Sequence, residues 1–196
     1  MRNQALIGFA MLLMLLGAHR SWAQTGTPAK APLSISGTAT DVTNSEIQAA
    51  AKVNPSAAVL DQALRVVSIN GEYNVAIGVV HRNKTNGPVP SGAVEHSQIT
   101  EVYHVISGSG TLVTGGAIEN SKPTDPDSDV VKVIVGPSTR GDKIQGGVSR
   151  KLGPGDVVII PPNTPHWFSE VTSDQIVYLV FRVDPKKVLP AGYKLK

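Results

Sequence analysis

Imidazole and carboxylate side chains are the groups in this sequence best suited to chemistry. Histidine occurs five times and cysteine not at all. Disulfides and thiolate ligands are therefore excluded, and any metal site must use nitrogen and oxygen ligands, which favour harder metal ions. His81, His96, His104 and His166 lie well inside the chain, and Glu101 stands between the second and third of them.

Three of these histidines fall in two segments with regularly spaced glycine and proline. In the first segment His96 is followed by Glu101 and then by Gly108. Glycine at such positions frees the backbone for a sharp turn between strands. The second segment has a comparable turn pattern before a histidine, carried by Gly155, Pro161 and His166.

Together the two segments resemble the two signature motifs of the cupin superfamily. In that resemblance His96 stands at the second histidine of the first motif, Glu101 at its glutamate and His166 at the histidine of the second motif. The likeness covers roughly residues 64–184 and implies an all-β fold, a double-stranded β-helix or jelly-roll barrel. Asn163 stands where the family usually has glycine, and asparagine is the residue next best able to take a positive φ.

Two positions depart from the family pattern. Val94 stands two residues before His96, where the family usually has the first histidine of a pair. Glu170 occupies the position of a polar residue often found after the second-motif histidine. The ligand set that the resemblance implies is therefore two imidazoles and one carboxylate, namely His96, His166 and Glu101. This set leaves coordination positions open and suits one divalent ion, Fe(II) first, with Mn, Ni, Co or Zn as alternatives.

Further side chains are candidates for the neighbourhood of that ion. Tyr103 is two residues from Glu101, so on a strand both point to one face, and its phenol could coordinate, donate a proton or pack. Tyr103 and Glu101 are the candidate catalytic residues. His81 belongs to the bulkier apolar face of a predicted strand and is expected inward, as an additional ligand, a pocket residue or a hydrogen-bonded histidine. His104 has the opposite parity from Glu101 and is expected to point away.

A succession of short strands must position these side chains. The Asn70-Gly71 pair predicts a tight hairpin turn between strands at 65–69 and 73–82. Many short strands separated by Gly, Pro and Asn turns are typical of an all-β sandwich or barrel. The other predicted strands are 101–106, 110–114, 130–135, 157–160, 166–170 and 175–183.

Other segments surround this barrel of residues 64–184. Residues 41–63 are interpreted as an N-terminal helical segment, because cap-type residues precede 46–51 and a second helical turn is predicted near 56–63. Residues 119–149 are rich in Pro, acidic residues and Gly, and we interpret them as a long connection with additional loops between the two halves of the barrel. Whether it covers the site stays open. Residues 185–196 are interpreted as a C-terminal tail.

The chain begins with features of a secretory signal peptide. Arg2 precedes an apolar run at residues 5–17, and small residues stand at Ser21 and Ala23. The run is shorter than the roughly 20 residues that a spanning helix needs. We therefore expect residues 1–23 to be removed, giving a periplasmic or secreted protein with no membrane attachment. Residues 24–40 have the composition of a flexible leader.

Length and charge narrow the classes of partner. At 196 residues with 41% apolar side chains, the chain suits a single globular domain. Loss of Arg2 and Arg20 with the signal peptide lowers the formal charge from +3 to +1, and no basic cluster suggests nucleic acid. The unpaired sheet edges of a single barrel favour a homodimer or small oligomer.

Two classes of function fit this sequence. The first is a metal-dependent enzyme acting on a small organic molecule, as a dioxygenase, isomerase or lyase, with the metal as Lewis acid or oxygen-binding centre. The second is a non-catalytic cupin that binds a small molecule or a metal. Val94 in place of a ligand favours the second, whereas Glu101 and His166 in the family spacing favour the first.

Overall fold

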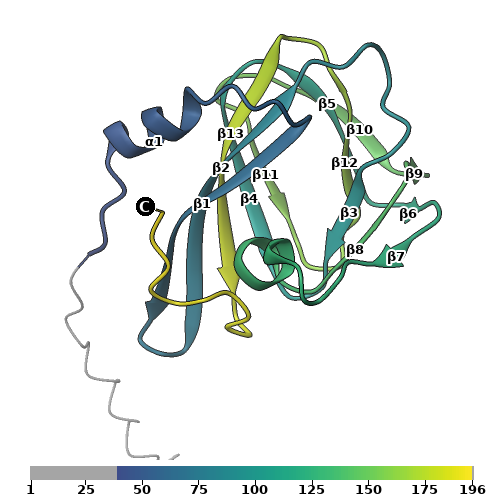
Figure 1. Ribbon diagram of the computed structural model, residues 1–196. Helices are drawn as coiled ribbons and strands as arrows, with labels where there is room; N and C mark the ends of the chain where they lie inside the picture. The colour runs from purple at the N-terminus through teal and green to yellow at the C-terminus, as the bar shows by residue number, and fades with distance from the viewer. Residues whose placement is uncertain (1–38, 196) are drawn as a thin grey trace, which may run out of the picture. The chain divides into compact units, whose positions relative to one another are not determined.

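The computed structural model describes residues 39–195, and within them two antiparallel β-sheets form a jelly-roll barrel (Figure 1). This confirms the predicted fold class. The predicted signal peptide, residues 1–23, and nearly all of the leader, 24–40, lie outside the described residues. Within the described part, no helix combines the length and the hydrophobicity needed to cross a membrane.

The five-stranded sheet has the order β1-β2-β13-β4-β11. Asn70 and Gly71, with φ angles of 51° and 71°, form the turn between β1 and β2, as the Asn-Gly pair predicts. The strands in this order are Val59–Ile69, Tyr73–Asn83, Gln175–Asp184, Thr100–Ser107 and Val157–Ile160.

The six-stranded sheet has the order β10-β5-β12-β3-β8-β7. Its strands in this order are Val148–Leu152, Gly110–Thr114, His166–Val171, Ala93–His96, Ser138–Gly141 and Lys122–Pro123. A separate pair, β6 (Ala117–Ile118) and β9 (Ile144–Gln145), lies on the side of the barrel away from helix α1 (Figure 1).

The barrel core lies between the two sheets. Alternate side chains of each strand point inward, so Tyr103 and Val105 of β4 meet Leu112 of β5 and Phe168 of β12. All four are buried. Burial of each such side chain contributes on the order of 1.5–3 kcal/mol. The site residues are therefore held on a closely packed frame.

The outer face of β1 and β2 is also covered. Helix α1 (Asn44–Ala51) begins with a capping box between Thr43 and Glu46, and its Ala50 packs on Val79. The helix ends at Ala51, and the chain enters β1 at Val59, so the second helical turn predicted near 56–63 is wrong. Residues 59–63 extend instead because β2 offers a complete row of partners, from Val59↔Arg82 to Ala63↔Gly78.

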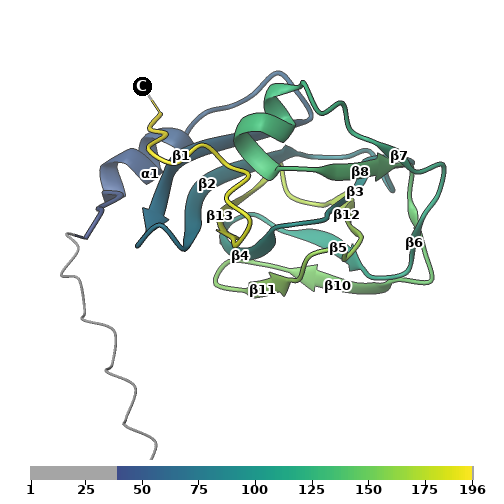
Figure 2. The ribbon, with the colours of Figure 1, turned by 90° about the horizontal axis from the view of Figure 1, so that it is seen from below.

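The C-terminal segment packs against the barrel. Leu189 is buried with Val66, Ala76 and Ile99, and Lys194 forms a β-bridge with Arg65. Both views show it returning toward α1 (Figures 1 and 2). Residues 185–196, interpreted from sequence as a tail, thus cover the end of the five-stranded sheet as far as they are described.

Residues Val130–Val135 form a π-helix, η1, where the sequence predicts a strand. Five of these six residues are β-branched, which normally favours a strand. Here only Val131 and Val135 are buried, and they lie one helical turn apart. The Gly136 N–H donates to the Val131 carbonyl at 3.1 Å, and this bond between residues five positions apart is typical of a π-helix. Packing of one helical face has overridden the local strand preference.

Candidate metal centre

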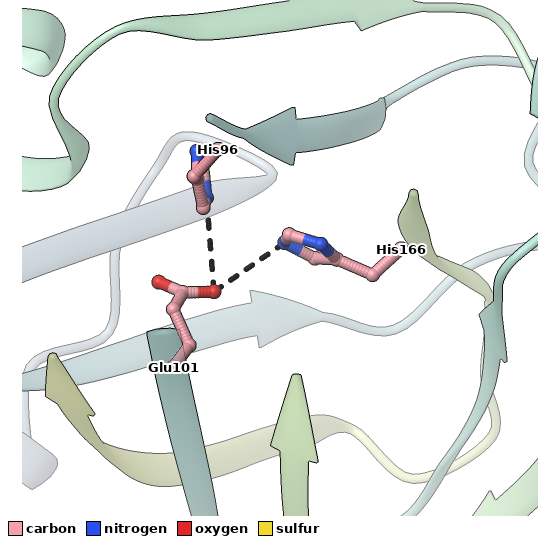
Figure 3. Close-up of side chains that lie close together, drawn as sticks. All are labelled: His96, Glu101 and His166. Atoms are coloured by element: carbon pink, nitrogen blue, oxygen red, sulfur yellow. Dashed lines mark ion pairs between the residues drawn. The ribbon is translucent and has the colours of Figure 1, made fainter. Parts of the chain in front are cut away.

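His96, Glu101 and His166 converge from three strands on one interior point (Figure 3). His96 ends β3, Glu101 is near the start of β4, and His166 begins β12. Strands β3 and β12 are neighbours in one sheet, whereas β4 belongs to the other. All three side chains are buried, and one ligand atom from each lies within 4.8 Å of the others.

The turn before His166 is tied to the first motif. Asn163 has a φ of 57°, as expected for asparagine in place of glycine. Its backbone N–H donates to the His96 carbonyl at 2.9 Å. One hydrogen bond therefore fixes the end of β3 against the turn that presents His166.

Both imidazoles are oriented through their Nδ1 atoms. His166 Nδ1–H donates to the Thr164 carbonyl at 3.0 Å. The Ser138 hydroxyl donates to the Gly136 carbonyl at 2.8 Å, so its oxygen accepts from His96 Nδ1–H at 2.7 Å. A neutral imidazole with its proton on Nδ1 carries a lone pair on Nε2. The Nε2 atom of each ring is thus prepared as a ligand.

The Glu101 carboxylate meets these two Nε2 atoms with one oxygen. Oε2 lies 3.7 Å from His96 Nε2 and 3.4 Å from His166 Nε2. The Tyr103 hydroxyl donates to the same Oε2 at 2.8 Å, and Arg182 Nε donates to Oε1 at 2.9 Å. Figure 3 shows both rings pointing toward this carboxylate.

Burial and charge set the protonation of this cluster. Burial lowers the pKa of His96 to about 3, more than Glu101 raises it. Burial likewise lowers the pKa of His166, against the effect of Glu101. Burial raises the pKa of Glu101, but the permanently charged Arg182 and the hydrogen bond from Tyr103 lower it and keep the carboxylate ionised beside neutral imidazoles. The cluster therefore consists of two neutral imidazoles and one carboxylate.

This arrangement fits a divalent metal ion. Two nitrogen lone pairs face a carboxylate oxygen with no hydrogen atom between them, and a cation placed among them replaces this repulsion by attraction. Tetrahedral ligands at about 2.0 Å from an ion lie about 3.3 Å from one another. The observed separations of 3.4 and 3.7 Å from Oε2 are close to this spacing.

The family-model match agrees with this geometry. Residues 49–192 match the family model described as Cupin. The chain belongs to the cupin family. No curated protein matches this cupin.

Solved structures are similar to this chain at low identity. A protein of Bacillus halodurans is 13% identical, with a TM-score of 0.46, over 80% of this cupin and 89% of that chain. A putative mannose-6-phosphate isomerase of Ralstonia eutropha is 19% identical, with a TM-score of 0.40, over 68% and 93%. The DMSP lyase DddQ of Ruegeria pomeroyi is 16% identical, with a TM-score of 0.40, over 70% and 53%.

Arg182 is a site residue of this cupin that sequence reasoning missed. It lies on β13 directly opposite Glu101 of β4 and is fully buried. Besides Glu101 it pairs with Asp61 of β1 through its terminal nitrogens. One signal was present in the sequence: a lone charged residue between Phe181 and Val183 in an apolar strand needs a partner when buried.

His81 lies outside the cluster of His96, Glu101 and His166, which corrects its predicted inward orientation. The ring is buried beneath α1, where Nε2 donates to the Ala50 carbonyl at 2.9 Å and Nδ1 lies 3.2 Å from Gln175 Oε1. Because α1 covers the outer face of β2, both faces of this strand are apolar, and side-chain bulk does not mark the interior. Arg82, with the opposite parity, is the residue that faces the pocket.

His104 and Tyr103 lie where their parity predicts. His104 is exposed on β4 beside Val157 of β11. Tyr103 is buried, lines the pocket and contacts Glu101. Alternation along one strand therefore separates a residue of the site from a residue of the surface.

A cavity of about 400 Å³ is lined in part by His96, Glu101 and His166. Its walls are mainly apolar, and Val94, in place of the family's first histidine, is part of them. The 119–149 connection lines this cavity through η1 and β8, so it covers the site as well as joining the halves of the barrel. The apolar residues of this connection that line the cavity are Val130, Ile134 and Val135.

Proposed function

We propose that this cupin is a metal-dependent enzyme acting on a small organic molecule. The observation that carries the proposal is the convergence of His96 Nε2, His166 Nε2 and the ionised Glu101 Oε2 beneath a cavity of about 400 Å³. A cavity of this size encloses one small ligand. The three ligand atoms and the ligand space therefore share one pocket.

The three side chains would hold one divalent ion. Such an ion, when bound, supplies Lewis-acid polarisation of a carbonyl or carboxylate, or a position for dioxygen. Two imidazoles and one carboxylate suit Fe(II), with Mn, Ni, Co and Zn as alternatives. Val94 supplies no fourth ligand, which leaves room for substrate on that side. Ser138 and Thr164 keep the two rings in the ligating tautomer.

Tyr103 is the proton-carrying group beside the centre. Burial, followed by the Glu101 charge, raises the pKa of this phenol well above its ordinary value, so it remains protonated. Its hydroxyl donates to Glu101 and lines the cavity. A phenol that stays protonated is a fixed hydrogen-bond donor that would stabilise negative charge developing on a substrate oxygen, which favours chemistry of the isomerase or lyase type over dioxygenation.

The Tyr103→Phe variant tests this role. We expect this variant to keep its full metal content. Its rate of deuterium exchange into the substrate should fall about 100-fold or more, because the phenyl ring keeps the packing but lacks the hydroxyl proton. The measurement is deuterium incorporation from heavy water into small oxo acids and ketones, followed by NMR, together with elemental analysis. Tyr73→Phe, at the start of β2, is the matched control. An unchanged rate in Tyr103→Phe would exclude the phenol from proton transfer.

Metal retention should persist in acid. Protons compete with metal for an ordinary imidazole below its pKa of about 6.5, so the metal affinity of such a ligand falls as the pH is lowered to 5. Because burial lowers the pKa of His96 to about 3, protons compete for this ligand only at much lower pH. We expect unchanged occupancy between pH 7 and pH 5 after dialysis, measured by elemental analysis. A metal affinity that falls about tenfold or more between pH 7 and pH 5 would contradict the protonation states given above.

The absence of the fourth ligand also favours a second function. Val94 leaves three protein ligands, so this cupin is alternatively a binding protein that holds a metal or small molecule without turnover. Stoichiometric metal with substrate-dependent deuterium exchange or oxygen uptake supports the enzyme. Stoichiometric metal with neither activity across oxo acids, ketones and hydroxy acids supports the binding protein.

A further inference from the structure

Two arginines of neighbouring strands differ in what they contact. Arg182 of β13 is fully engaged by Glu101 and Asp61. Arg82 of β2 donates from Nε to the Tyr178 hydroxyl at 3.0 Å, and its guanidinium lies over the Phe168 ring, 5.0 Å from the centroid. No ion pair or further side-chain hydrogen bond of Arg82 occurs among the described residues.

Arg82 lies at the wall between two cavities. It lines the cavity over the metal centre, together with His166 and Glu101. It also lines an adjoining cavity of about 450 Å³, together with Trp167 and Phe168. Its contacts with Tyr178 and Phe168 hold the guanidinium plane, while its terminal N–H groups have no protein acceptor in the described part of the chain. The side chain is thus held in place without an ion pair of its own, and Asp61, whose charge also acts on it, is paired with Arg182.

The charged residues around the pocket, together with a divalent ion, would give it a net positive charge that favours a bound anion. Glu101 and Asp61 carry one negative charge each, and Arg182 and Arg82 one positive charge each. Asp125 and Arg140, both exposed where they line the cavity, cancel one another. A divalent ion therefore brings the pocket to a net charge of about +2. A partly buried cation without a partner is costly, and a bound anion offsets that cost.

We propose that Arg82 is the anion subsite of this pocket and holds the carboxylate of an organic acid whose reacting part lies at His96, Glu101 and His166. The planar guanidinium fork matches a carboxylate through two parallel hydrogen bonds. The largely apolar walls accept the carbon skeleton of such an acid. This inference rests on the proposed function for the reacting end of the substrate, and it names the substrate class.

Carboxylate binding to metal-free protein tests the subsite separately from the metal. The probes are 2-oxobutyrate, malonate and benzoate, with 2-butanone as the neutral analogue of the first and inorganic phosphate as a second anion. Titration calorimetry and NMR give the dissociation constants for the full chain. We expect at least one of the carboxylates to bind, and Arg82→Met to weaken it about 10- to 100-fold, whereas Arg82→Lys weakens it less.

Two controls separate the possible failures. Arg150→Met, on β10 and outside both cavities, should leave the carboxylate affinity unchanged. The affinity for 2-butanone should be the same in the wild-type protein and in Arg82→Met. His166→Ala should keep the Arg82-dependent carboxylate binding even though it removes a proposed metal ligand, so loss of metal and loss of the anion subsite are distinguishable. Circular dichroism confirms that each variant is folded.

Three results would overturn the subsite. The first is that no carboxylate probe binds the wild-type protein. The second is a carboxylate affinity in folded Arg82→Met equal to that of the wild-type protein. The third is tighter binding of inorganic phosphate than of every carboxylate, which would change the class of ligand.

Discussion

Replacing His166 with alanine is expected to remove most of the bound metal while the barrel remains folded. His166 Nε2 is one of only three protein ligand atoms in the cluster, so its loss leaves two. The ring lies at the start of β12 and its Nδ1 contact is a local one to Thr164, so the sheets do not depend on it. We expect a similar result for His96→Ala. Elemental analysis together with circular dichroism measures both properties.

Two control variants show whether the loss of metal depends on how directly a residue contacts the proposed ion. His104→Ala removes an exposed histidine of the same β4 strand as Glu101 and should leave metal content unchanged. Ser138→Ala keeps all three ligands but removes the acceptor that orients His96, and we expect metal affinity about 10- to 100-fold weaker. Full metal occupancy in folded His166→Ala protein would show that the site lies elsewhere.

Arg182→Met is expected to destabilise the protein by about 3–5 kcal/mol in its metal-free form. Arg182 is the shared partner of Glu101 and Asp61, and methionine fills a similar volume without the charge. The fully buried Glu101 would then lack its permanent cation, whereas Asp61 is partly exposed and water would compensate part of its loss. Urea denaturation followed by circular dichroism measures the change in free energy of unfolding.

A double variant identifies the cause. Glu101→Gln combined with Arg182→Met removes both buried charges and should recover part of the stability lost in Arg182→Met alone, because no uncompensated carboxylate remains in the barrel. Arg150→Met, a matched substitution on β10, should change the free energy of unfolding by less than about 0.5 kcal/mol. A stability of Arg182→Met within that same margin would show that Arg182 does not support Glu101.

Local signals in the sequence predicted much of the barrel. The Asn70-Gly71 turn and the alternating strands follow from backbone preferences that depend on a few neighbouring residues. The strands predicted from 101 and 166 correspond to β4, which begins at Thr100, and to β12, which begins at His166, whereas no strand was predicted for β3, which ends at His96. Strand parity likewise placed Tyr103 inside and His104 outside.

The incorrect predictions share one physical cause, which is packing against segments distant in the chain. The β-branched run Val130–Val135 has the composition of a strand, yet it forms a helix because two valines one turn apart are buried. His81 has the parity of the bulkier face, yet that face lies under α1. Neither outcome depends on residues close in sequence.

The sequence by itself predicted the fold class, because turn residues and strand patterns act locally, and the resemblance of its two motifs to the cupin superfamily implied the three candidate ligands. Only the tertiary structure decided the electrostatics of the site. Arg182 supports Glu101 because β13 lies beside β4, and the two residues are 81 positions apart. Ser138 orients His96 because β8 lies beside β3. Arg82 faces the cavity because α1 covers the other face of β2. Strand neighbours and layers come from the packing of the whole chain, and no local pattern encodes them.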